Sequence, residues 1–273
     1  MKWLILTFSL LWLPAVAQEA RVIRISIGAD PYIVELLTLA LSYEQTPSKI
    51  VSVRNVVSQA RAIRLLGKKS GVDVSWLVTN SQREKAARAI RIPLVKGLLG
   101  YRIPLVHRDN RHALSAIRYI GDLRSFTFGL RSDWPDHEIF EQNGLHVMSF
   151  SQEQSGYEML AKKRFDILPS DFVSIESALS DPRLHADHYV AFYYPSAVYF
   201  FVSHDDQLLY EQLKKGLKRA LQDGKFEALF LKHFSSRVKA LDLENKTIIE
   251  LSNPTLPPSA PLEIPHYWHT QGK

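Results

Sequence analysis

The sequence has 273 residues, of which 46% are hydrophobic and 23% charged, with no cysteine and a formal net charge of +6. This composition is typical of a globular protein, and the lack of cysteine excludes disulfides and lipid attachment at a processed N-terminus. The basic residues are scattered along the chain, so a nucleic-acid partner is not indicated. A mildly basic surface that attracts anionic solutes or membrane headgroups is expected instead.

The first 17 residues are predicted to be a secretory signal peptide. Lys2 precedes the apolar run Trp3 to Leu13, and an A-x-A pattern occupies positions 15–17. The run is shorter than the ~20 residues that a membrane span needs, so a membrane anchor is the less favoured alternative. We expect cleavage before Gln18, a soluble periplasmic protein, and a net charge of +5 after Lys2 is removed.

Strands and helices alternate through the first part of the chain. The alternating residues Ile23, Ile25 and Ile27 predict a strand, and Asp30-Pro31 predicts the cap and first position of a helix. A strand at 49–53, a helix and a strand at 72–78 follow. The predicted inner face of that helix consists of Val56, Val57, Ala60, Ile63 and Leu66. This order predicts a parallel sheet covered by helices, which is an α/β fold.

The same alternation recurs after "PLVKGLLGYRIPLVHRDN" and ends before "AVYFFVSHDD", two segments predicted to be long strands that cross between lobes. We predict two α/β lobes, the second inserted in the first. Lobe 1 is expected at 18–107 and 200–252, lobe 2 at 108–199, and an extended proline-rich tail at 253–273. Ligands of open α/β sheets bind beyond the carboxyl ends of the strands, so the expected site is a cleft between the lobes, closed by a hinge.

The stretch "DVSWLVTNSQREKAARAIRIPL" (73–94) ends a predicted strand in a polar turn. The guanidinium of Arg83 can hold a carboxylate with two parallel hydrogen bonds, and a helix start there offers backbone N–H groups as well. The alternative is an ordinary strand-to-helix turn, in which Asn80 and Ser81 cap the helix and Arg83 lies on the surface. The sequence alone leaves both open.

From Arg21 to Phe234 the order of elements resembles the type II periplasmic binding proteins, specifically the extracellular solute-binding family 3 that serves polar amino-acid uptake. Three stretches carry the resemblance: "SGVDVSWLVTNSQREKAARAIRIPL", "LRSDWPDHEIF" and "KRFDILPSDFVSIESAL". The second stretch lies where that family has an anion-binding helix start in its second lobe. The resemblance implies a two-lobed solute-binding protein that closes on its ligand.

Carried over by position, the resemblance implies that Arg83 receives a ligand carboxylate and that Asp171 meets an α-amino group. Asn80 stands where that family usually has threonine, and Tyr32 lies where aromatic residues often wall the pocket. The sequence departs from the family at Asn80, at Ser170 in place of glycine, and at the bulky Trp134. These departures favour a specialised ligand or a sensory role.

The predicted ligand-binding residues are therefore Arg83, Asn80, Asp171, Tyr32, Trp76 and Trp134. Asp171 could equally cap a helix that begins near Phe172, and the three aromatic residues could equally pack in the core. Histidine pairs at 185/188 and 266/269 are a weak metal signal. We expect no cofactor or metal.

We expect a monomeric, non-enzymatic protein that captures a small carboxylate-bearing solute and hands it to the permease of an ABC transporter or to a sensor. The alternative is a periplasmic enzyme on the same fold, such as a dehydratase of a small organic acid. It would need a carboxylic acid with a raised pKa in the cleft, and Glu153, Glu158 and Glu176 are the available candidates. A third interpretation is a degenerate lobe pair that binds protein.

Overall fold

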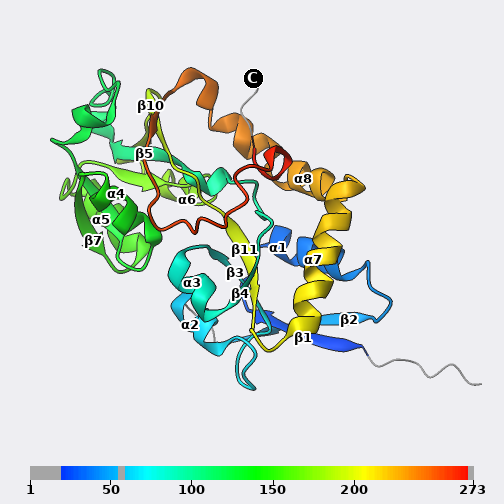
Figure 1. The fold of residues 1–273 in the computed structure, drawn as a ribbon. Coiled ribbons are helices and arrows are strands. Elements are labelled where there is room, and N and C mark those ends of the chain that lie inside the picture. The colour runs from blue at the N-terminus through cyan, green and yellow to red at the C-terminus, as the bar shows by residue number, and fades with distance from the viewer. Residues whose placement is uncertain (1–19, 55–58, 270–273) are drawn as a thin grey trace, which may run out of the picture.

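A computed structural model describes residues 20–54 and 59–269 and shows two lobes side by side (Figure 1). The predicted signal peptide, Val56 and Val57, and the last four residues of the predicted tail lie outside the described residues. Within the described ranges, no helix has the length and apolar character needed to cross a membrane.

Lobe 1 contains two groups of strands. β1 (Arg21–Ser26) and β2 (Ser48–Val53) pair in parallel, whereas β11 (Val198–Val202) lies antiparallel between β3 (Val74–Val78) and β4 (Arg88–Ile90). The amide of Asp73, just before β3, donates to the carbonyl of Arg24 at 2.8 Å and joins the two groups. Ile23 and Ile25 face the core as predicted, but Ile27 is exposed because β1 ends at Ser26.

Helices cover both sides of these strands (Figure 1): α1 (Pro31–Leu41), α7 (Gln207–Gln222) and α8 (Lys225–Ala240) on one side, α2 (Gln59–Leu65) and α3 (Ser81–Ala86) on the other. The predicted start of α1 is confirmed, since Asp30 accepts the amide of Tyr32 at 2.8 Å. The predicted inner face of α2 is wrong at Ala60, which is exposed. Ala62 and Leu66, four residues apart, are the buried pair because this short helix turns that stripe toward the strands.

Lobe 2 is built on β5 (Tyr101–His107), which pairs antiparallel with β8 (Leu168–Ser170), β9 (Leu184–Ala186) and β10 (Val190–Tyr193). β12 (Thr247–Glu250) adds in parallel to β10, and β6 (Thr127–Arg131) pairs in parallel with β7 (His146–Phe150). The helices are α4 (Pro135–Gln142), α5 (Glu153–Ala161) and the short α6 (Ile175–Ala178). Phe128, Phe140 and Phe192 meet edge to face or tilted in its core.

The structure moves the predicted lobe boundaries. β5 and β12, both assigned to lobe 1 from the sequence, pair within the lobe 2 sheet, and β11 begins at Val198 in lobe 1. The two expected crossing strands are short connections instead. The first spans 91–100 and ends in the 3-10 turn Leu98–Gly100, and the second spans 194–197. Apolar runs predict strands but do not say which strand each one pairs with.

The chain crosses between the lobes again after α8. It enters lobe 2 as β12, and residues 252–269 then return to lobe 1 (Figure 1, orange to red). Tyr267, in the 3-10 turn Pro265–Tyr267, is buried in the core of lobe 1.

Candidate ligand-binding cleft

Two cavities lie between the lobes, and each contains three of the six predicted ligand-binding residues. The first, of about 420 Å³, is lined by Tyr32 and Trp76 from lobe 1 and by Asp171 from lobe 2. The second, of about 580 Å³, is lined by Asn80 and Arg83 from lobe 1 and by Trp134 from lobe 2. The structure therefore places Arg83 and Asp171 at different parts of the interlobe cleft.

Arg83 is half-buried on α3 and faces the second cavity. One of its guanidinium nitrogens, Nη1, donates to the carbonyl of Val78 at 2.5 Å. Burial lowers the pKa of Arg83, and the negative charges of Asp133 and Asp136 across the cleft act in the opposite direction. Among the residues that the structure describes, no carboxylate forms an ion pair with Arg83, so its remaining donors are available to an anion.

The start of α3 differs from the prediction that its backbone N–H groups would help to hold an anion. The side-chain oxygen of Asn80 accepts the amide of Arg83 at 2.8 Å, which makes Asn80 the cap of this helix. The amide of Ser81 donates to the carbonyl of Thr255 at 3.1 Å, and the amide of Glu84 to the carbonyl of Asn80. Since these three donors are used internally, the side chain of Arg83 is the charged group that this helix start offers to a ligand.

Asp171 caps the turn that precedes α6, whereas the helix itself begins at Ile175, later than the predicted start near Phe172. Oδ1 of Asp171 accepts the amides of Val173 and Ser174, both at 2.8 Å. Its Oδ2 lies 3.3 Å from Nη1 of Arg102. The carboxylate still lines the first cavity, so a role in meeting an α-amino group stays a prediction.

Arg102 is the centre of a buried polar cluster that the sequence did not reveal. This residue of β5 is only 3% exposed, and its Nη2 lies 2.6 Å from the carboxylate of Asp136, also 3% exposed. Its Nε donates to the hydroxyl of Tyr194 at 2.9 Å, and that hydroxyl donates to Asp136. Burial opposes the charge of Arg102, but the two carboxylates and Tyr194 raise its pKa overall. The only sequence signal was an arginine inside the apolar run of β5.

This cluster also changes the expectation for the start of α4. The resemblance placed an anion-binding helix start at this point of lobe 2. In the structure the first turn of α4 contains Asp136, whose buried carboxylate is paired with Arg102. A negative side chain therefore occupies the place where an anion was expected, and the cation that faces this part of the cleft, Arg83, lies on lobe 1.

The three predicted aromatic residues differ in their surroundings. Tyr32 is fully buried, donates its hydroxyl to the carbonyl of Leu94, and packs edge to face on Phe234 at 4.6 Å, so it belongs to the core at the cavity wall. Trp76 is half-buried in β3 and faces the first cavity. Trp134 precedes α4, with the guanidinium of Arg131 5.6 Å from its ring.

No protein-family model and no curated protein matches the sequence. Many solved structures do match. An ancestral arginine-binding protein bound to arginine is 15% identical with a TM-score of 0.57, over 78% of this chain and 98% of that one. A histidine kinase sensor domain with similarity to periplasmic binding proteins is 16% identical with a TM-score of 0.57, over 80% and 97%. This chain has the fold of the type II periplasmic binding proteins.

An arginine-specific periplasmic binding protein of Salmonella typhimurium matches the same fold with a TM-score of 0.54 and 14% identity, over 78% of this chain and 99% of that one. The predicted two-lobed α/β architecture is thus confirmed. At this level of identity the matches establish the periplasmic-binding-protein fold, and the ligand has to be argued from the cleft.

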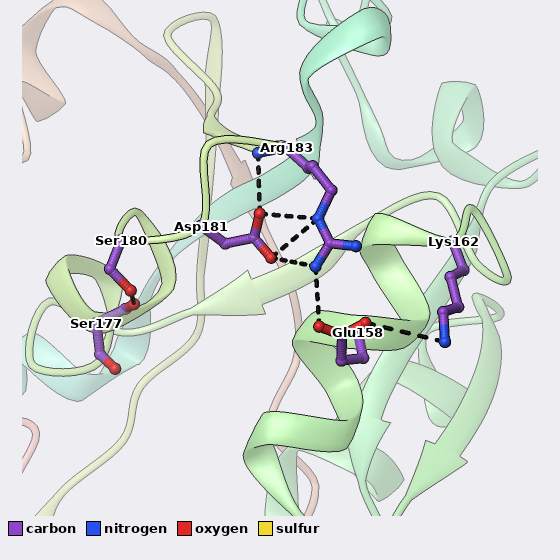
Figure 2. Close-up of polar contacts among 6 residues, drawn as sticks. All are labelled: Glu158, Lys162, Ser177, Ser180, Asp181 and Arg183. Carbon is purple, nitrogen blue, oxygen red and sulfur yellow. Dashed lines mark hydrogen bonds and ion pairs between the residues drawn. The ribbon is translucent and has the colours of Figure 1, made fainter.

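The acids considered for an enzyme on the periplasmic-binding-protein fold line neither described cavity. Glu158 bonds to Arg183 on the surface of lobe 2 (Figure 2), at 2.8 Å. Glu153 accepts the hydroxyl of Tyr157, and Glu176 is exposed. For the metal alternative, the described residues contain no group of three or more histidine or acidic side chains arranged to hold an ion.

Proposed function

We propose that this chain is an exported solute-binding protein that holds a small carboxylate-bearing solute in the interlobe cleft. The observation that carries the proposal is Arg83, a half-buried guanidinium that lines the second cavity without an ion-paired carboxylate in the described part of the chain. A planar guanidinium binds a carboxylate with two charge-assisted hydrogen bonds, and partial burial strengthens them.

The remainder of the cleft supports a small organic solute. The first cavity combines the half-buried indole of Trp76 with the small polar side chains of Ser26, Ser75 and Ser174. An apolar wall with a few polar groups is typical of small-molecule sites. The solute's carboxylate would meet Arg83, and its body would extend toward Trp76.

The structural matches support two destinations for the bound solute. Their names describe amino-acid-binding proteins of transporters and a sensor domain of a histidine kinase. The partner of this chain is accordingly a membrane permease or a sensor protein in the periplasm. We propose a non-enzymatic role, because Glu153, Glu158 and Glu176 lie outside the cavities and the acids that do line them have internal partners. Asp30 and Asp171 accept backbone amides, Asp133 pairs with Arg131, and Glu138 accepts from Gln142.

Calorimetry with a panel of small carboxylates (acetate, succinate, glutarate, L-glutamate and L-arginine) tests the proposal, and native mass spectrometry of gently purified protein identifies a retained solute. Removing one partner of a buried charge pair costs about 2–5 kcal/mol, so Arg83→Ala should weaken binding by roughly 30-fold to 4,000-fold. Lys85→Ala is the matched control, because Lys85 is an exposed cation of the same helix that lines neither cavity. Unchanged affinity in Arg83→Ala would mean that the 80–83 stretch is only a turn.

A further inference from the structure

Residues 252–269, which we call the strap, begin on lobe 2. Leu251, directly before the strap, is buried in the core of that lobe. Asn143, at the end of α4, then exchanges two hydrogen bonds with Ser252: its Nδ2 donates to the Ser252 carbonyl at 2.8 Å, and its Oδ1 accepts the Ser252 amide at 3.0 Å. The strap is therefore fastened to lobe 2 where it starts.

The far end of the strap is fastened to lobe 1, on the first crossing segment. The ring of Trp268 lies directly on Gly97, where an added Cβ would be 2.5 Å from the indole Cε3. The amide of His269 donates to the carbonyl of Lys96 at 2.7 Å. Lys96 and Gly97 have φ angles of 50° and 74°, an unusual left-handed pair in the connection between the lobes.

The residues directly after Ser252 contact the second crossing segment and the helix of the candidate site. The side-chain amide of Asn253 donates to the carbonyl of Pro195 at 2.8 Å. The carbonyl of Thr255, a residue only 9% exposed, accepts the amide of Ser81, the first residue of α3. The same segment thus bonds to both crossing segments and to the helix that carries Arg83.

We propose that the strap positions α3, and with it Arg83, and fixes the separation of the two lobes, so that the cleft is formed before a solute arrives. Hinge motion requires backbone angles to change in the crossing segments. A segment bonded to both of them and anchored in a core opposes that change. A second contact opposes hinge motion as well: Phe172 of lobe 2 is buried and packs edge to face on Phe234 of α8 at 5.2 Å. Only the statement about Arg83 rests on the proposed function.

Pulsed electron resonance on a double-cysteine protein tests the lobe separation, and the cysteine-free chain makes the labelling specific. Lys68→Cys in lobe 1 and Gln154→Cys in lobe 2 place labels at two exposed positions. We expect one narrow distance distribution for this reference protein, and a distribution at least twice as wide after Trp268→Ala. Leu262→Ala, an exposed position on the strap, is the control and should keep the narrow distribution. Equal widths for Trp268→Ala and the reference would overturn the proposal.

Hydrogen exchange at the start of α3 tests the positioning role. Loss of the Thr255 acceptor should speed exchange of the Ser81 amide at least tenfold in Trp268→Ala, while the amide of the buried Leu213 in α7 stays protected. Trp268→Phe should restore most of the protection. Acceleration of both amides alike would show general destabilisation and contradict the proposal.

If Trp268→Ala does not fold, Asn143→Ala releases the strap at its other end and should give the same two results. Unchanged distance and exchange in Asn143→Ala would then overturn the proposal. None of these measurements uses a solute. They remain decisive even if Arg83→Ala shows that the proposed function is wrong.

Discussion

Replacing Arg102 by methionine tests whether the buried cluster holds lobe 2 together. The change removes the only described cation paired with Asp136, which is 3% exposed, and takes a hydrogen bond from Tyr194. Leaving one member of a buried ion pair without its partner typically costs about 3–5 kcal/mol. For a protein of this size that corresponds to a melting temperature lower by about 6–20 °C. Losing Arg102 should cost less stability at Asp171 than at Asp136, because Oδ1 of Asp171 keeps two backbone hydrogen bonds.

Urea unfolding at pH 7, followed by circular dichroism, measures this loss of stability. Arg102→Met combined with Asp136→Leu should recover much of it, since exchanging both partners of a buried pair for apolar groups is often nearly neutral. Arg131→Ala is the control, because its pair with Asp133 is exposed and should contribute about 1 kcal/mol or less. A loss below about 1 kcal/mol for Arg102→Met would refute the reasoning, because it would place the cluster in the same class as surface pairs.

Three further predictions concern pH, ligand class and export. Hydrogen bonds from Arg183 lower the pKa of Asp181 to about 2 (Figure 2), so its stabilising contribution is present above the unfolded value near 3.8 and is lost as the pH falls toward 2. Asp181→Asn should therefore be less stable than the parent in urea at pH 5, and the difference should shrink as the pH falls through 2; a constant difference would contradict the assignment. Asp171→Asn should weaken L-aspartate tenfold or more and leave succinate within twofold if Asp171 meets an α-amino group, whereas equal effects would leave it as a cap alone. N-terminal sequencing of periplasmic protein should begin at Gln18, and material starting at Met1 would rule out the predicted cleavage.

Local chemistry was predictable from the sequence, and long-range pairing was not. The Asp30 cap and the burial of Ile23 and Ile25 in β1 depend on neighbours within a few residues, and both were correctly predicted, whereas Ile27 lies beyond the strand and is exposed. The cluster of Arg102 joins β5 to α4 and to Tyr194 directly after β10, and Asp136 and Tyr194 are 34 and 92 positions from Arg102 in the sequence. No periodicity encodes such a pairing, because a charged residue in an apolar run has the same local pattern whether it is paired or misplaced.

The path of the tail shows the same limit. Its prolines indicate an extended segment, which lacks regular hydrogen bonds of its own. Its contacts depend on single fits: the indole of Trp268 against Gly97, and the Thr255 carbonyl against the amide of Ser81. Each of these contacts joins residues more than 170 positions apart. The sequence therefore showed where the tail begins but not which residues it contacts.

Arg102 also links the stability of lobe 2 to the chemistry of the cleft. Asp136 lies near enough to Arg83 to influence its pKa, so an uncompensated charge on Asp136 would repel a carboxylate arriving there. The guanidinium of Arg102, 2.6 Å from Asp136, offsets that negative charge within the protein. Asp133, which acts on Arg83 more strongly than Asp136 does, is paired with Arg131. With both carboxylates paired inside lobe 2, the proposed function leaves Arg83 to an external anion. If Arg83 receives a carboxylate as proposed, the buried pair contributes to anion binding without touching the solute, although of these two arginines only Arg83 lines the second cavity.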